Sequence, residues 1–178
     1  MRARLDRGAW LHALPIEFPP LRDVEAFLAE MGARLSRPFQ CVRQEAIASP
    51  LQLLLGAAQA YEAWRSGSAY AKRLEIELLL RIAATSQVEE ALRRVGLRPG
   101  SRRAWLVALS LSPRAPSTQP LARPLTLSSV ERPPLEGLLR AYGVKREALR
   151  AYLLLGADEH DALAYHLCEL AALELARR

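Results

Sequence analysis

The chain has 178 residues, of which 51% are hydrophobic, and it carries a formal net charge of +6. This length suits one domain with a single substantial core, and the hydrophobic share excludes a globally disordered chain. The apolar runs stop short of the roughly 18 residues that a membrane span needs. No signal-peptide core follows the basic first residues, so we expect a cytoplasmic protein without a membrane partner.

Nearly all basic side chains are arginines, because Lys72 and Lys145 are the only lysines. Arginine binds phosphate through two hydrogen bonds and stacks on bases, so a nucleic-acid partner is one interpretation; a biased genome base composition is the other. Cys41 and Cys168 lack a metal-ligand spacing, and we expect two buried thiols. The three histidines form no ligand set. The sequence therefore predicts no metal, no cofactor and no catalytic residues.

The first 43 residues predict strand, helix and strand. Residues 9–18 alternate between apolar and polar towards their end, which indicates an opening strand, and Pro15 indicates an edge position for it. Apolar side chains recur at helical spacing over residues 21–35. Residues 38–43 predict a second, short strand.

A longer helix follows. Ser49 provides the cap and Pro50 the first turn, and the Ser-Gly-Ser stretch at 66–68 ends it. We expect this helix to bury the stripe formed by Leu51, Leu54, Leu55, Ala58 and Tyr61.

Two apolar segments meet at a short polar break, Ala84-Thr85-Ser86-Gln87. Residues 74–82 alternate enough for a strand, but their Leu, Glu and Arg content favours a buried helix; residues 87–95 predict an amphipathic helix. Ser86 and Glu89 have the spacing of a capping box. A helix start of this kind is a seat for phosphate, or it is simply a cap.

The second half begins with a turn at 99–101 and a nearly continuous apolar run at 103–111, which predicts a central strand. Residues 112–134 hold half of the prolines and predict a surface loop, with a short strand at 125–130. Two short helices are expected at 135–142 and 145–155.

The last helix is expected from a cap at Asp158 to the end of the chain, residues 158–178. It is apolar on nearly every face and must therefore be covered on nearly every face. Either it is the central helix of this domain's own core, or an outside protein covers part of it.

These elements predict an α/β (α+β) protein: a small, mostly antiparallel sheet flanked by helices, in a single domain over residues 1–178. The segment around the break also carries a family pattern. An acidic residue and apolar run (Glu77-Leu78-Leu79-Leu80) precede the small polar loop at 83–87, and Val88, Ala91-Leu92 and Gly96 follow it. With Gln44-Glu45-Ala46-Ile47-Ala48 upstream, this resembles the kinase-binding subunit of the KEOPS (EKC) complex, the PRPK-binding protein family of archaea and eukaryotes.

The chain departs from that family at three places. Archaeal members usually carry Ser-Gly where this chain has Ala83-Ala84, and glycine allows backbone conformations that alanine does not. Members often place a basic residue just before the Gln, where this chain has Ser86. The proline-rich segment 112–134 also differs from that of typical members.

The resemblance implies a non-catalytic subunit of the complex that makes threonylcarbamoyladenosine next to the anticodon of tRNA. In the family, this subunit binds the small atypical kinase/ATPase of the complex and the single-stranded 3′ CCA end of tRNA. For tRNA we expect contacts from Lys72, Arg73, Arg81, Ala84, Thr85, Ser86, Gln87 and Val88. For the kinase we expect contacts from Leu163, Leu167, Leu170, Ala171, Leu173 and Glu174.

Elementary chemistry agrees with both sets of residues. A single-stranded tail is held by cationic contacts to phosphate and by apolar or stacking contacts to its bases. An apolar helix buries its outer face on a partner. Two other functions stay open: a structural adaptor that uses the last helix without contacting RNA, and an enzyme that holds a phosphorylated small molecule at Thr85 and Ser86.

Overall fold

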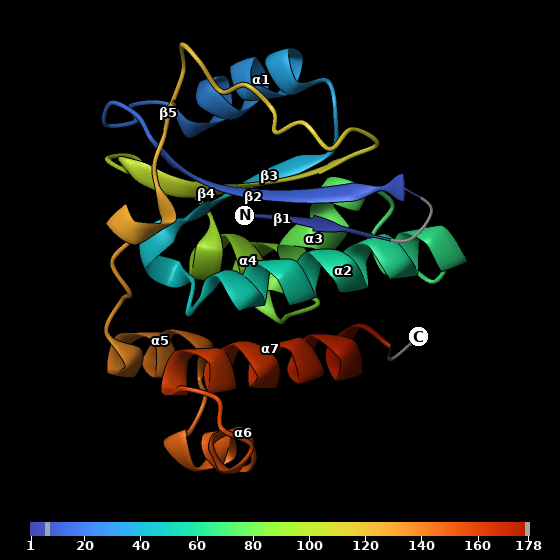
Figure 1. Ribbon diagram of the computed structural model, residues 1–178, viewed down its shortest axis with the longest axis vertical. Helices are drawn as coiled ribbons and strands as arrows, with labels where there is room; N and C mark the ends of the chain where they lie inside the picture. Colours follow the sequence, from blue (N-terminus) through green and yellow to red (C-terminus); the bar gives the residue numbers. More distant parts are fainter. Residues whose placement is uncertain (6–7, 177–178) are drawn as a thin grey trace. The chain divides into compact units, whose positions relative to one another are not determined.

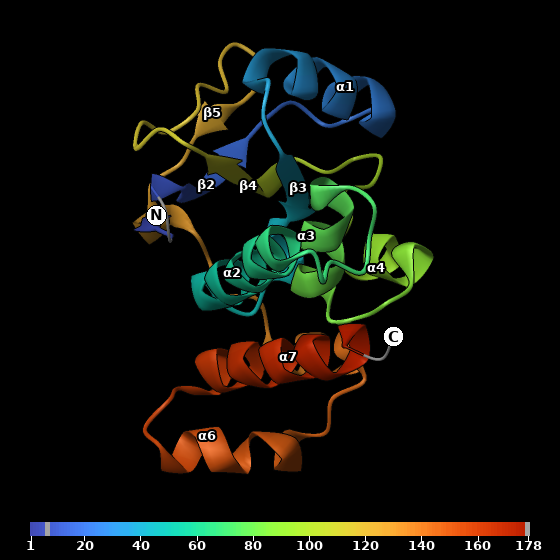
Figure 2. The same ribbon diagram turned by 90° about the vertical axis from the view of Figure 1, so that its right-hand side faces the viewer.

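A computed structural model describes residues 1–5 and 8–176 of the protein (Figures 1 and 2). The chain forms two compact units. Unit 1 comprises Met1–Gln44 and Gly96–Glu131, and unit 2 comprises Glu45–Val95 and Arg132–Arg178. Each unit is therefore assembled from two separate stretches of sequence.

Unit 1 is built on an antiparallel sheet with the strand order β1-β2-β4-β3, and the short β5 pairs with β2. Its strands are β1 (Arg2–Arg4), β2 (Trp10–Glu17), β3 (Phe39–Arg43), β4 (Arg103–Ser110) and β5 (Arg123–Pro124). The mixed α/β class and the antiparallel sheet are confirmed. The apolar run at 103–111 does form an inner strand, because β4 lies between β2 and β3.

The expected edge position of Pro15 is wrong, because β2 lies inside the sheet. Pro15 is opposite Trp105 of β4, and its carbonyl oxygen accepts a hydrogen bond from the Leu125 N–H at 2.8 Å, on the other side. The N and C=O of one strand residue point to the same side, so the missing donor of Pro15 faces away from β4. On that other side, the pairing of β2 with β1 extends only as far as His12. The missing N–H of Pro15 therefore removes no hydrogen bond between β2 and either adjacent strand.

One helix of unit 1, α1 (Val24–Leu35), lies against the sheet (Figure 1). It begins three residues later than expected, because Asp23 is its cap and accepts from the Ala26 N–H at 2.9 Å. Phe27, Met31 and Leu35 enter a core that also contains Cys41. Burial raises the pKa of the Cys41 thiol to about 12, as suits an inert core cysteine.

The strand expected at 125–130 is wrong. Within the proline-rich segment, Arg123–Pro124 pair with β2 as the short β5, and Leu127–Ser129 form a 3₁₀ turn. The hydroxyl of Ser129 donates to the Thr126 carbonyl at 2.7 Å, and such local bonds compete with strand pairing.

Unit 2 is helical in its described part, and α2, α3 and α7 pack together (Figures 1 and 2). Capping fixes the predicted ends: Ser49 caps α2, Gly67 ends it with a φ of 74°, and Asp158 caps α7. Residues 145–155 form a 3₁₀ turn, Arg146–Leu149, followed by a short helix. The helices are α2 (Pro50–Ser66), α3 (Leu74–Ala83), α4 (Val88–Val95), α5 (Leu135–Tyr142), α6 (Arg150–Leu154) and α7 (Glu159–Leu175).

The face of α2 that is buried differs from the expected one. The Leu-Tyr stripe is only half-buried, and the fully buried face is made largely of small residues: Leu53, Gly56, Ala57, Ala60 and Ala63. Gly56 shows why, because a Cβ at this position would lie 3.1 Å from the backbone nitrogen of Ile82. Small side chains let α2 and α3 approach closely, and hydrophobicity alone does not reveal such a face.

Candidate functional site

The break between α3 and α4 has a defined geometry. Helix α3 ends at Ala84, a non-glycine residue with a φ of 51°, and the Thr85 N–H donates to the Leu80 carbonyl at 3.2 Å. The hydroxyl of Thr85 then accepts from the Gln87 N–H at 3.2 Å, and α4 begins at Val88. The two helices and the polar break are therefore as predicted.

The expected capping box is wrong. The Ser86 hydroxyl donates to Glu174 Oε1 of α7 at 2.8 Å. Ser86 therefore joins the break to the last turn of the chain's final helix.

Arg94 of α4 stabilises the break by hydrogen bonds to its backbone carbonyls. Its Nη1 donates to the carbonyls of Ala83 at 3.0 Å and Ala84 at 2.9 Å, and its Nε donates to Glu90 at 2.7 Å. Its guanidinium also stacks on the Tyr142 ring, 5.8 Å from the centroid. Arg94 is not among the residues expected at the site, although its i, i+4 spacing from Glu90 was a usable signal.

Behind the break lies a fully satisfied polar network. The amide nitrogen of Gln52 donates to the Ile82 carbonyl at 2.9 Å and to the Tyr142 hydroxyl at 2.8 Å, while its oxygen accepts from the Ala48 N–H at 2.9 Å. Tyr142 donates in turn to the Ala46 carbonyl at 2.8 Å. Because every member is paired, this buried network fixes α2, α3 and α5 to one another.

The eight residues expected to contact tRNA do not share one surface. Lys72, Arg73, Gln87 and Val88 are exposed, Ser86 is half-buried, and Arg81, Ala84 and Thr85 are buried. Lys72 and Arg73 precede the ten-residue α3 and so lie about 15 Å from the break at its other end. The basic residues expected to contact tRNA are therefore not gathered at the break.

Arg81 in particular does not face the break. Its Nε donates to Glu77 Oε1 at 2.8 Å, one helical turn back, and Glu77 Oε2 accepts from the Ala71 N–H at 2.8 Å. The Glu77 side chain is fully buried and that of Arg81 is 9% exposed. This buried ion pair was readable as Glu-x-x-x-Arg in the sequence, and its loss would leave an uncompensated charge.

Carboxylates lie around the start of α4. Glu89 and Glu90 occupy its first turn, and Glu174 engages Ser86. The hydrogen bond from Arg93 and, more weakly, the one from Arg94 lower the pKa of Glu90 to about 2, although burial opposes them. This helix start is consequently less favourable for phosphate than the sequence alone indicated.

The residues expected to contact the kinase divide in the same way. Leu163, Leu167 and Ala171 are buried within the chain, so they are core residues and not available to a partner in this conformation. Leu170 and Glu174 are half-buried, and Leu173 is 64% exposed. Of the expected kinase contacts, only those on the outer side of α7 are therefore accessible. The expected end of this helix, at Arg177 and Arg178, lies outside the described residues.

More apolar surface lies beside α7. Leu154 and Leu155, at the end of α6, are 87% and 86% exposed. Tyr152 of α6 stacks on Tyr165 of α7, with 6.0 Å between the ring centroids. Burial, followed by a hydrogen bond to Glu169, raises the pKa of Tyr152. The paired tyrosines attach α6 to α7 and leave the leucines uncovered.

Residues 1–5 and 8–176 contain no cluster of three His, Cys, Asp or Glu side chains that could bind a metal ion. In the same part of the chain, the helices are too short or too polar to span a bilayer.

The fold and these surfaces define a mixed α/β protein with exposed apolar side chains on α7 and a polar break between α3 and α4. Residues 22–131 match the family model described as kinase binding protein CGI-121, and the chain belongs to this family. The resemblance seen in the sequence is thereby confirmed, and a kinase is the partner that the family implies. No curated protein matches the chain.

Proposed function

We propose that this protein is the non-catalytic kinase-binding subunit of a KEOPS-type tRNA-modification complex, where it binds the small atypical kinase/ATPase and the 3′ CCA end of tRNA. The family match over residues 22–131 is the observation that carries the proposal. The pattern from Glu77 to Gly96 lies within this match and supports the more specific assignment.

The outer side of α7 supports kinase binding. Leu173 is largely exposed on a helix whose opposite side is anchored by Leu163 and Leu167 in the core. An anchored helix offers its exposed side chains to a partner at little cost in conformational entropy.

The test for the kinase is a pull-down with the cognate small kinase. Deleting residues 158–178 would remove part of the core, so a point variant is more informative. We expect Leu173→Asp to weaken binding at least tenfold, and Leu127→Asp, the same change on an exposed leucine of unit 1, to leave it within twofold. Equal binding by both variants would place the kinase elsewhere.

The exposed side of α4 supports contact with a nucleotide tail. Val88 and Leu92 are exposed and one turn apart, so they form a small apolar floor next to Gln87. Bases splayed from a single strand stack or pack on such a floor while cations contact the phosphates. Lys72 and Arg73 supply charge one helix length away, within reach of a few nucleotides.

The test for RNA uses the only two lysines as a matched pair. Lys72→Glu is expected to weaken binding of CCA-ended tRNA severalfold and to lower its salt dependence, whereas Lys145→Glu is expected to change neither. Val88→Glu should weaken binding of tRNA only when the CCA end is present. If removal of the CCA end has no effect on the unmodified protein, the proposed contact is wrong.

A second function is favoured by one observation, the three carboxylates around the break. They suit a structural adaptor that binds the kinase and makes no RNA contact. An absence of any gel shift with CCA-ended tRNA, together with intact kinase binding, would support this adaptor.

A further inference from the structure

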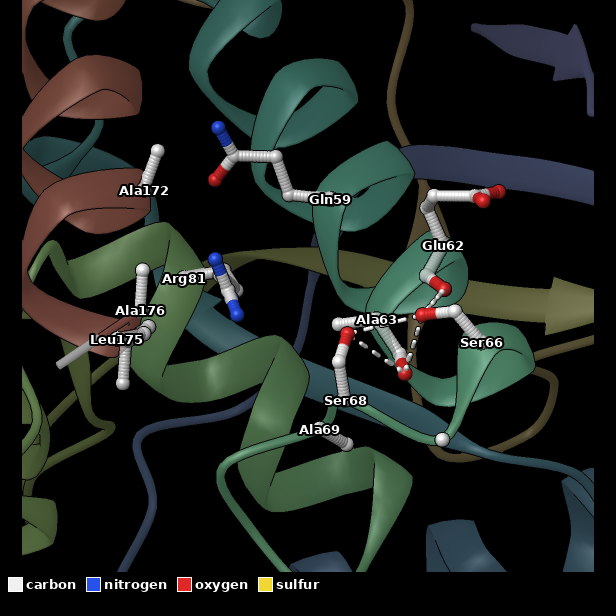
Figure 3. Close-up of a pocket in the computed structure, with 11 residues that line it drawn as sticks. Gln59, Glu62, Ala63, Ser66, Ser68, Ala69, Arg81, Ala172, Leu175 and Ala176 are labelled. Carbon is white, nitrogen blue, oxygen red and sulfur yellow. Dashed lines mark hydrogen bonds between the residues drawn. The ribbon is translucent and has the colours of Figure 1, made fainter. Parts of the chain in front are cut away.

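Unit 2 contains a pocket that is separate from the break. It has a volume of about 530 Å³ and lies between the C-terminal ends of α2 and α7, with Arg81 of α3 on its inner side (Figure 3). Residues 84–88 are not among its described lining. Arg81 is shared with the residues expected to contact tRNA, but it does not face the break, so the pocket is a different site from the break.

Arg81 is the chemical centre of this pocket. The ion pair with Glu77 uses Nε, and the two terminal nitrogens have no hydrogen-bond partner among the described residues. Figure 3 shows the guanidinium between Ala63 of α2 and Ala172 and Ala176 of α7. Glu77 holds the guanidinium in one orientation, so its forked end is presented to the pocket with little freedom to lose on binding.

The remaining lining limits what the fork can bind. The apolar walls are the methyl groups of the lining alanines and the side chain of Leu175, which suit a small apolar body, and the polar lining residues besides Arg81 are Gln59, Glu62, Ser66 and Ser68. The Ser66 hydroxyl donates to the Glu62 carbonyl at 2.9 Å and lies 2.8 Å from the Ser68 hydroxyl, so these groups have few donors to spare. Gln59 also lines the pocket, and its Oε1 is a buried acceptor without a partner among the described residues. The pocket thus offers the donor pair of Arg81 between apolar walls and a polar side.

The charges around the pocket further restrict the kind of anion that it can bind. Arg81 is already compensated by the buried Glu77, and Glu62 adds a second carboxylate at the exposed side of the pocket. A phosphate with about −1.5 to −2 charges and three acceptor oxygens needs more cationic donors than this. A carboxylate brings one charge and two oxygens, which match the two nitrogens of an arginine fork.

We propose that this pocket binds a single carboxylate carried on a small apolar group, with both oxygens on the terminal nitrogens of Arg81. Two sources have this chemistry: a free small carboxylic acid and the C-terminal carboxylate of a polypeptide. The site requires neither RNA nor kinase, so its test is independent of the proposed function.

The test is an NMR titration of the purified chain with isobutyrate, N-acetylalanine and inorganic phosphate. It follows the Arg81 side-chain Nε–H signal and the backbone amides of Ala172 and Ala176. We expect saturable shifts with a Kd of about 1–10 mM for a carboxylate and weaker binding of phosphate. Tighter binding of N-acetylalanine assigns the site to a polypeptide end, and equal or tighter binding of isobutyrate assigns it to a free acid.

Three variants locate the site. Arg81→Lys keeps a charge opposite Glu77 but removes the fork, so affinity should fall at least tenfold. Ala172→Glu places a carboxylate in the pocket and should abolish binding, and it serves if the lysine variant fails to fold. Leu173→Glu adds the same charge to an exposed neighbour outside the pocket and should retain binding within twofold. Absent saturation, tighter phosphate binding, or equal affinities in all variants would overturn the proposal.

Discussion

Ser86 and Glu174 are joined by a hydrogen bond of 2.8 Å, although 88 positions separate them in the chain. Ser86 belongs to the residues expected to contact tRNA, and Glu174 belongs to those expected to contact the kinase. A partner that engages the Glu174 carboxylate would release the Ser86 hydroxyl at the break, so this bond is a direct physical link between the two proposed surfaces.

The energy of that link is measurable by a double-mutant cycle in urea unfolding. Ser86→Ala and Glu174→Ala should show a coupling of about 0.5–1.5 kcal/mol, because the bond joins a hydroxyl to a charged acceptor. As a control, Ser86→Ala and Glu169→Ala should be additive within about 0.5 kcal/mol. Additivity in the first pair would show that the bond has no energetic weight in solution.

Replacing Ala84 by glycine should stabilise the protein. Its φ of 51° costs an L-residue about 1–2 kcal/mol, and glycine adopts it without that cost. We expect Ala84→Gly to raise the free energy of unfolding by about 0.5–1 kcal/mol after the greater entropy of the unfolded chain is counted. Ala83→Gly, one residue earlier and still helical, should lower it by about 1 kcal/mol. The same sign for both variants would contradict the explanation.

Gly56 and Gly137 both lie within helices, and they should respond to alanine in opposite directions. A Cβ on Gly56 would approach backbone atoms of Ile82 to 3.1–3.2 Å, so Gly56→Ala should destabilise the protein by about 1–3 kcal/mol. At Gly137 a Cβ meets nothing within 4 Å, and alanine should stabilise α5 by about 0.5–1 kcal/mol. Thermal unfolding of the two variants is sufficient to check the signs.

Glu90 should make the stability of unit 2 depend on acid pH. Its pKa is about 2 in the folded protein against 4.5 ordinarily, so its contribution is complete above pH 4.5 and is lost as the pH falls towards 2. The side chain is partly exposed, so this contribution is less than about 1 kcal/mol. The stability difference between the native protein and Glu90→Gln should therefore vanish near pH 2. A pH-independent difference at Glu90 would refute the assignment.

The sequence predicted most of the elements because their signals are local. Ser49 and Asp158 are capping residues followed directly by helices. The nearly continuous apolar run in β4 is typical of a strand inside a sheet. The edge position predicted from Pro15 was wrong because an inner strand tolerates proline wherever its N–H would have no acceptor on the neighbouring strand. The buried face of α2 was predicted wrongly because glycine and alanine are weakly hydrophobic. Their role is to let the neighbouring helix approach closely.

The candidate site was less predictable because its partners are distant in sequence. Nothing near Ser86 reveals that Glu174 is its acceptor. By contrast, the pairing of Arg81 with Glu77 follows a helical spacing of four and was available from the sequence. The kinase-binding family was recognisable because its pattern is confined to a short segment around the break.

The small-residue face of α2 has a consequence for biosynthesis. Its packing partner α3 begins at Leu74, shortly after α2 ends at Ser66, whereas the hydrogen bond from Gln59 to the Cys168 carbonyl of α7 spans 109 positions. At a ribosomal rate of about 5–20 residues per second, α2 and α3 are both synthesised several seconds before α7. The contact between α2 and α3 therefore has time to form during synthesis, and the contact with α7 forms last.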